Sequence, residues 1–175
     1  MKLTLIVPAL TLCSCSILGT SSKVHREPTR PLRNVAVLIA TDNMFADVAT
    51  DGQIFLFTKS IAEELSDRKL FRYKILDKKY SIQALNDLET SLLGVELREQ
   101  YDAMLICSPR SEFNANRVVM RLYQTTPAFE IVRVSHSARM GNSYWFPQTS
   151  GAMLIDATHG AMDRLEKTLK KFEGE

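Results

Sequence analysis

Two nearly unbroken apolar runs limit the folds open to this chain more than any other feature. Residues 34–41 read NVAVLIAT and residues 101–108 read YDAMLICS. A strand with one solvated face alternates apolar and polar side chains, whereas a strand covered on both faces has no need to alternate. Both runs therefore predict buried strands of a covered sheet, which is typical of α/β domains.

The residues between these two runs indicate helices and a further strand. Thr50 or Asp51 can cap a helix, and its apolar face is Ile54, Phe57, Ile61 and Leu65. Residues 71–75 alternate between apolar and basic side chains, which predicts a half-covered strand nearer an edge of the sheet. Ser81 can cap a second helix, whose apolar face is Ile82, Leu85, Leu88 and Leu92.

A hairpin and a long helix complete the expected domain. Residues 109–116 are turn-like, residues 117–124 and 129–137 read as two alternating strands, and residues 125–127 make the turn between them. A helix from about Gly151 repeats apolar residues at three and four positions. The expected order is β-α-β-α-β-β-β-α, a single three-layer-like α/β domain over residues 34–175 with a mixed sheet and a C-terminal amphipathic helix.

The start of the chain has the pattern of a secretory signal peptide. Residues 3–12 are largely apolar behind Lys2, and as a helix they would reach only about 15 Å, too short for a bilayer that takes about 20 residues. Leu12, Ser14 and Cys15 follow in a pattern that resembles a bacterial lipobox. We therefore expect residues 1–14 to be a lipoprotein signal peptide and Cys15 to be lipidated. An ordinary signal peptide, or a fortuitous apolar start on a cytosolic protein, is the alternative.

What the lipobox resemblance implies is an acylated anchor. The amino-terminal cysteine of such proteins carries a diacylglyceryl group and usually a third acyl chain, a palmitate, and two or three chains make membrane attachment stable. Ser16 after the cysteine, in place of an aspartate, favours the outer membrane by resemblance to the bacterial sorting pattern. The expected location is the outer membrane, with the domain facing the periplasm.

Residues 15–33 are expected to be the lipidated cysteine and a flexible basic tether. After Cys15 the stretch contains four basic residues and one acidic residue, together with glycine, serines and prolines, a composition that cannot bury a core. Its charge could contact anionic lipid head groups or peptidoglycan, while a solvated linker is the plainer alternative. From Asn34 onward the chain has 17 basic and 19 acidic residues, so the domain is mildly acidic and the slight basicity of the whole chain comes from the tether.

Most classes of chemistry are not supported by the sequence. The net charge of +2 gives no indication of nucleic-acid binding, and neither a phosphate-binding glycine loop nor a nucleophile elbow occurs. The histidines at 25, 136 and 159 are too scattered for a zinc site. Cys107 lies in an apolar run where small apolar packing is its usual role. We expect no metal, no cofactor, no catalytic residue and no enzymatic activity.

Two segments are candidate binding sites. The turn at residues 42–52 has Asp42, Asp47 and Asp51 after a buried strand, where open α/β sheets often bind ligands; loop solvation and helix capping are the alternative. Tyr144, Trp145 and Phe146 are consecutive, so they cannot all face one core, and tryptophan and tyrosine favour interfaces. These aromatic residues are partner-interface candidates, unless two of them close the end of the sheet.

The whole pattern resembles a superfamily of bacterial envelope proteins. It holds the TolB amino-terminal domain, the curli secretion lipoprotein CsgG, the Pel polysaccharide export lipoprotein PelC and the penicillin-binding-protein activator LpoB. The matching segments are residues 35–43, 60–78, 101–109 and 117–124 and the closing helix. This chain departs from the family in the turn after Gln124 and in the longer stretch around Trp145. A barrel like the curli channel would need added strand pairs, so the compact periplasmic members are the better analogue.

The resemblance implies binding, oligomerisation or partner activation, with no catalytic residues to carry over. Our leading hypothesis is an outer-membrane lipoprotein that forms a homo-oligomer or docks on an envelope protein partner, for export or assembly. The alternative is a lipoprotein activator of a peptidoglycan synthase. A small ligand-binding or hydrolytic domain that uses the 42–52 loop is the third hypothesis.

Overall fold

The computed structural model describes residues 20–40, 51–76, 97, 99–112, 115–139 and 150–174. Within them, strands β1 (Ser21–Val24), β2 (Asn34–Ile39), β3 (Arg72–Ile75), β4 (Ala103–Glu112), β5 (Ala115–Thr125) and β6 (Ala128–Arg139) form one sheet. Helices α2 (Asp51–Arg68) and α5 (Ser150–Glu173) pack on it. The expected mixed α/β domain with a C-terminal amphipathic helix is confirmed.

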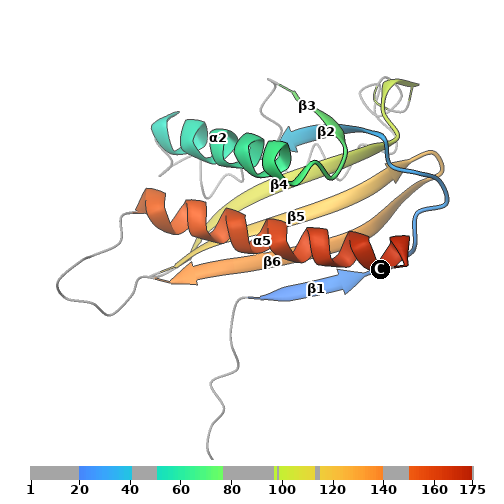
Figure 1. The fold of residues 1–175 in the computed structure, drawn as a ribbon. Coiled ribbons are helices and arrows are strands. Elements are labelled where there is room, and N and C mark those ends of the chain that lie inside the picture. The colour runs from blue at the N-terminus through green and yellow to red at the C-terminus, as the bar shows by residue number, and fades with distance from the viewer. Residues whose placement is uncertain are drawn as a thin grey trace, which may run out of the picture.

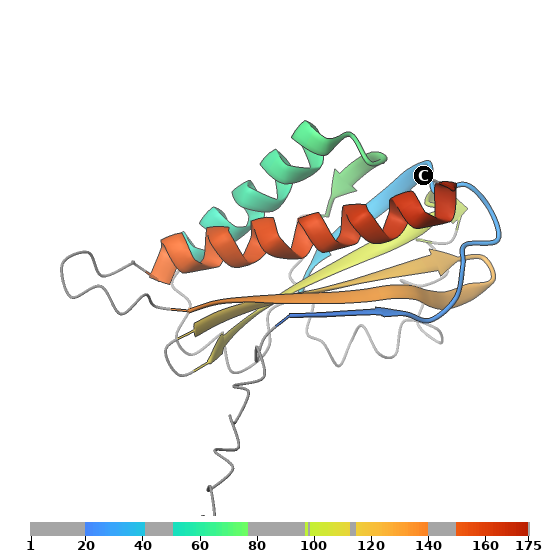
Figure 2. The same ribbon diagram turned by 60° about the horizontal axis from the view of Figure 1, so that its bottom comes forward.

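The six strands are ordered β1-β6-β5-β4-β2-β3. Strand β2 is parallel to both of its neighbours, β3 and β4, whereas the pairs β4–β5, β5–β6 and β6–β1 are antiparallel. Helices α2 and α5 lie side by side on the same face of the sheet (Figures 1 and 2). The sheet therefore has a helix-covered face and an opposite face, which we call the outer face.

The core explains why the first apolar run has no alternation. Val35, Val37 and Ile39 belong to the large cluster under the helices. Ala36 and Leu38 belong to a second cluster on the outer face, which also includes Leu97. Strand β2 is buried on both faces, as predicted. The second predicted helix, with Ile82, Leu85, Leu88 and Leu92, lies outside the described residues.

Helix α2 uses the face that its spacing predicts. Phe57, Ile61 and Leu65 are each 0–1% exposed and pack into the large cluster. Val118, Met120 and Leu122 of β5 are fully buried in the same cluster, as the alternation of that strand predicts.

The prediction of a flexible tether through residue 33 is wrong for residues 21–24. These residues form β1, which pairs with β6 from Ser21 opposite Ser135 to Val24 opposite Val132. Ser21 Oγ and Ser135 Oγ are 2.9 Å apart, and Ser22 Oγ and Thr168 Oγ1 of α5 are 3.1 Å apart. All four residues of β1 are exposed, so the strand is held by its ladder and these hydroxyl contacts rather than by core burial.

The turn expected at residues 109–116 is also much shorter in the structure. Strand β4 continues to Glu112 and β5 begins at Ala115, because the antiparallel ladder extends through the pairs Arg110–Arg117 and Ser111–Asn116. Local composition suggested a turn, but cross-strand pairing keeps most of this segment extended.

Candidate functional site

The residues singled out from the sequence fall mostly outside the described part of the chain. Cys15, Asp42, Asp47 and the aromatic residues Tyr144, Trp145 and Phe146 all lie outside it, and Asp51 is the first residue of α2. Strands β2, β4 and β6 run in one direction, and they end where α2 and α5 begin (Figure 1). The described residues that flank both candidate segments therefore lie at the same end of the molecule.

Three large apolar side chains are exposed on the helix layer near this end. Phe55 is 67% exposed, Leu56 is 39% exposed and Ile155 is 46% exposed. Glu64 contacts His159 and Arg68 contacts Asp163, so the two helices run parallel with a constant offset. The same residue offset applies nearer the start of the two helices. One turn before the Glu64–His159 contact, Ile155 lies level with Ser60, and one turn earlier still Leu56 lies level with Gly151. We call Phe55, Leu56 and Ile155 the apolar patch.

A network of charges joins α2 to α5 farther along. Arg68 is 13% exposed, and its guanidinium contacts Glu64 and Asp163, each at 2.7 Å, and also Glu166. Burial opposes the charge of Arg68, but the hydrogen bonds to these carboxylates raise its pKa overall. The guanidinium therefore remains charged, and the network locks the two helices together.

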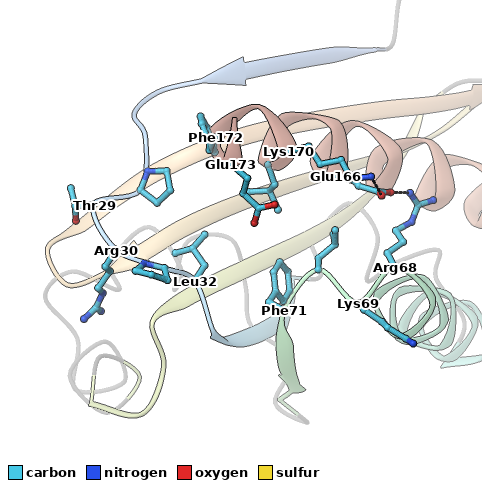
Figure 3. Close-up of a pocket in the computed structure, with 14 residues that line it drawn as sticks. Thr29, Arg30, Leu32, Arg68, Lys69, Phe71, Glu166, Lys170, Phe172 and Glu173 are labelled. Carbon is cyan, nitrogen blue, oxygen red and sulfur yellow. Dashed lines mark hydrogen bonds and ion pairs between the residues drawn. The ribbon is translucent and has the colours of Figure 1, made fainter. Parts of the chain in front are cut away.

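A groove opens beyond this network, at the end of the molecule where α2 and α5 finish (Figure 3). Its volume is about 750 Å³. The apolar lining includes Leu32, Leu70, Phe71, Leu169 and Phe172, and the charged lining is Arg30, Arg68, Lys69, Lys170, Glu166 and Glu173. No histidine, cysteine or serine is among the described residues that line it. The lining therefore combines apolar and charged side chains, as an amphipathic partner would require.

A polar cluster lies on the outer face of β5 and β6. A β-bulge shifts the register so that Leu122 faces Val132 but Tyr123 faces Glu130. Glu130 and Arg133 would otherwise point to opposite faces, but the bulge brings both to the outer face. Arg133 Nε and Nη2 donate to the carboxylate of Glu130 at 2.7 and 2.8 Å. Burial works against the charge of Glu130, yet Arg133 and its neighbours lower its pKa overall.

Cys107 and His136 pack inside the domain. Cys107 is fully buried, and burial raises the pKa of its thiol well above the ordinary range. His136 packs on Gly160 of α5, and burial followed by repulsion from Arg164 lowers its pKa. No group of three or more metal-binding side chains occurs among the described residues.

The sequence did not predict the groove, the apolar patch or the polar cluster at the β-bulge. Arg121 and Tyr123 alternate along β5 with Met120 and Leu122, which are buried under the helices, so Arg121 and Tyr123 lie on the outer face, as the alternation of residues 117–124 predicts. Which residues of β6 and β1 lie beside these β5 side chains depends on the strand register, and the local sequence pattern does not reveal that register.

No helix in the described ranges combines the length and the apolar character that crossing a bilayer requires. No protein-family model matches the sequence, and no curated protein matches it.

Solved structures do match in fold. The PelC dodecamer from Paraburkholderia phytofirmans, in a variant form, matches with a TM-score of 0.54 at 11% identity, over 83% of this chain and 97% of that chain. TolB from Acinetobacter baumannii matches with a TM-score of 0.42 at 8% identity, over 87% of this chain and 31% of that chain. A lipoprotein from Neisseria meningitidis matches with a TM-score of 0.45 at 12% identity, over 82% of this chain and 99% of that chain. The likeness to PelC shows a shared fold.

Proposed function

We propose that this chain is an outer-membrane lipoprotein, anchored at Cys15, whose periplasmic domain self-associates as a component of an envelope export or assembly complex. It acts by binding rather than by catalysis. The observation that carries the proposal is the shared fold with PelC, a protein solved as a dodecamer, over nearly the whole of that chain. The lipobox-like residues 12–15 support the anchor.

The apolar patch is the surface on which we place self-association. Scattered exposed apolar residues are ordinary on any protein. Here three of the four large exposed hydrophobic residues in the described part of the chain, Phe55, Leu56 and Ile155, lie within the first two turns of two adjacent helices. Aromatic and aliphatic side chains grouped in this way are typical of the central residues of a protein interface.

The alternative role, activation of a peptidoglycan synthase, requires the domain to reach inward from the membrane. Strand β1 begins at Ser21, only six residues after Cys15, and those residues span at most about 20 Å. The short span supports a domain held close to the membrane and so favours the first proposal.

The mass of the mature protein in detergent, measured by light scattering, tests self-association. We expect one species several times heavier than the monomer. A double variant with Phe55→Ser and Ile155→Ser should be monomeric, because each residue at the centre of an interface contributes on the order of 2 kcal/mol to association.

Val24→Ser is the matched control, because Val24 is also exposed, by 49%, but lies on β1 away from the patch. This variant should keep the wild-type mass. A wild-type protein that stays monomeric at high concentration would refute self-association. An unchanged mass in the double variant would refute the apolar patch as its surface.

A further inference from the structure

A row of cationic side chains crosses the outer face of three neighbouring strands. Lys23 of β1 is directly opposite Arg133 of β6, and Arg133 is directly opposite Arg121 of β5. Directly opposed residues on antiparallel strands have Cβ atoms about 5 Å apart. We call Lys23, Arg121 and Arg133 the basic row. The pair Arg110 and Arg117 lies on the same face farther along β4 and β5.

The contacts of neighbouring residues establish that this row points away from the helices. Ser22 contacts Thr168 of α5, so Lys23, the next residue in the strand, points to the opposite face. Met120 and Leu122 are buried under the helices, so Arg121 between them points to the outer face. Figure 2 shows the sheet with both helices on one side.

Within the part of the chain that the structure describes, the basic row has more positive than negative charge. Like charges directly opposite one another destabilise a sheet. Glu130 offsets one of the three cations by accepting two hydrogen bonds from Arg133. His25 Nε2 also lies 3.8 Å from Glu130 Oε1. Lys23 is exposed, and the side chain of Arg133 is 41% exposed. Among the described residues the row therefore has more positive than negative charge, and Lys23 and Arg133 present it to an external partner, although the domain from Asn34 onward has more acidic than basic residues.

The position of β1 in the chain indicates which partner this is. Lys23 is eight residues from Cys15, so a lipid anchor at Cys15 holds the edge of the sheet within about 25 Å of the membrane. Arginine and lysine side chains donate hydrogen bonds to phosphate oxygens. Anionic lipids attract basic residues near a bilayer surface.

We propose that the basic row docks on anionic phospholipid headgroups of the membrane that holds the anchor. This inference rests on the proposed anchor at Cys15. Docking through the outer face turns the helix layer, with its apolar patch, away from the lipid and leaves it accessible to a second copy. Each cation near the surface strengthens contact about fivefold.

The reactivity of lysine side chains in the lipidated full-length mature protein tests this docking. The protein is placed in vesicles of phosphatidylcholine alone, or of phosphatidylcholine with about a third phosphatidylglycerol, and amine labelling is measured for each lysine by mass spectrometry. Lys59 and Lys167, on the two helices, are controls within the same molecule. We expect labelling of Lys23 to slow about fivefold or more in anionic vesicles alone. The effect should be lost at about 1 M salt, where the Debye length is about 3 Å.

An anionic vesicle surface also lowers the local pH, which slows amine labelling even without docking. Two variants distinguish docking from this effect. Arg121→Gln with Arg133→Gln should restore the labelling of Lys23 in anionic vesicles, whereas Arg121→Lys with Arg133→Lys should preserve its protection. Circular dichroism checks the fold, and Arg133→Gln alone replaces the double variant if that one does not fold. Equal labelling of Lys23 in both kinds of vesicle, or protection that persists without the arginines, would overturn the proposal. Intact mass and flotation with neutral vesicles report on the anchor separately.

Discussion

At the scale of single residues, His159 shows how the helix layer uses charge. Its Nδ1 lies 2.8 Å from Glu64 Oε1 and its Nε2 lies 3.8 Å from Asp163 Oδ2. The hydrogen bond to Glu64 raises the pKa of His159, although partial burial opposes it. His159 therefore links α2 and α5 most strongly when it is protonated.

This arrangement predicts a pH-dependent contribution to stability. Because the folded-state pKa of His159 is above the unfolded value of about 6.5, its contribution is fully present below that value. The contribution is lost as pH rises through the folded-state pKa. His159→Gln should therefore reduce the free energy of unfolding more at about pH 5 than at about pH 8, as measured by urea titration.

Lys167→Gln on the same helix is the control, since lysine does not titrate across that range. A His159→Gln effect of equal size at both pH values would show that the ion pair contributes nothing to folding.

At the scale of elements, α5 approaches β6 closely at Gly160. A Cβ atom added there would lie 2.4 Å from the ring of His136, a distance that only a shift of helix or ring could relieve. Glycine inside a helix costs about 1 kcal/mol relative to alanine. The close packing of His136 against the helix backbone explains why glycine stands at this position.

This contact predicts that the effect of Gly160→Ala on the free energy of unfolding changes sign when the ring of His136 is removed. In the wild-type chain it should destabilise the fold by about 1–3 kcal/mol through overpacking. In a His136→Ala background the ring is absent, and the same change should stabilise the fold by up to about 1 kcal/mol. Urea unfolding of the four proteins in this double-mutant cycle measures both effects. The same sign in both backgrounds would contradict the contact.

Elements with their own apolar pattern were predictable from sequence. Phe57, Ile61 and Leu65 specify the buried face of α2 through their spacing, and Val118, Met120 and Leu122 specify that of β5. Strand β1 was missed because all four of its residues are exposed, so its pairing with β6 leaves no apolar alternation in the sequence.

At the scale of the whole molecule, the surfaces depend on register and long-range packing. The basic row needs Lys23, Arg133 and Arg121 to align across strands distant in sequence. The bulge after Leu122 that places Glu130 beside Arg133 has no local sequence pattern. The apolar patch likewise depends on the parallel offset of α2 and α5. Sequence therefore predicted the mixed α/β class and the buried faces of its elements, and tertiary pairing determined the surfaces.

These surfaces fit one arrangement of the protein at a membrane. The outer face with the basic row lies on the side of the sheet opposite the helices, and the apolar patch lies on the helix layer. A chain anchored beside β1 can therefore contact lipid with one face and a second copy with the other. This arrangement depends on the proposed lipid anchor at Cys15.

Intact mass spectrometry of the protein extracted from bacterial membranes detects the anchor itself. We predict a chain that begins at residue 15, lacks residues 1–14 and carries the added mass of a diacylglyceryl group, with or without a third acyl chain. A Cys15→Ala chain should lack that added mass. An uncleaved chain of 175 residues, or a cleaved chain without lipid, would contradict the account.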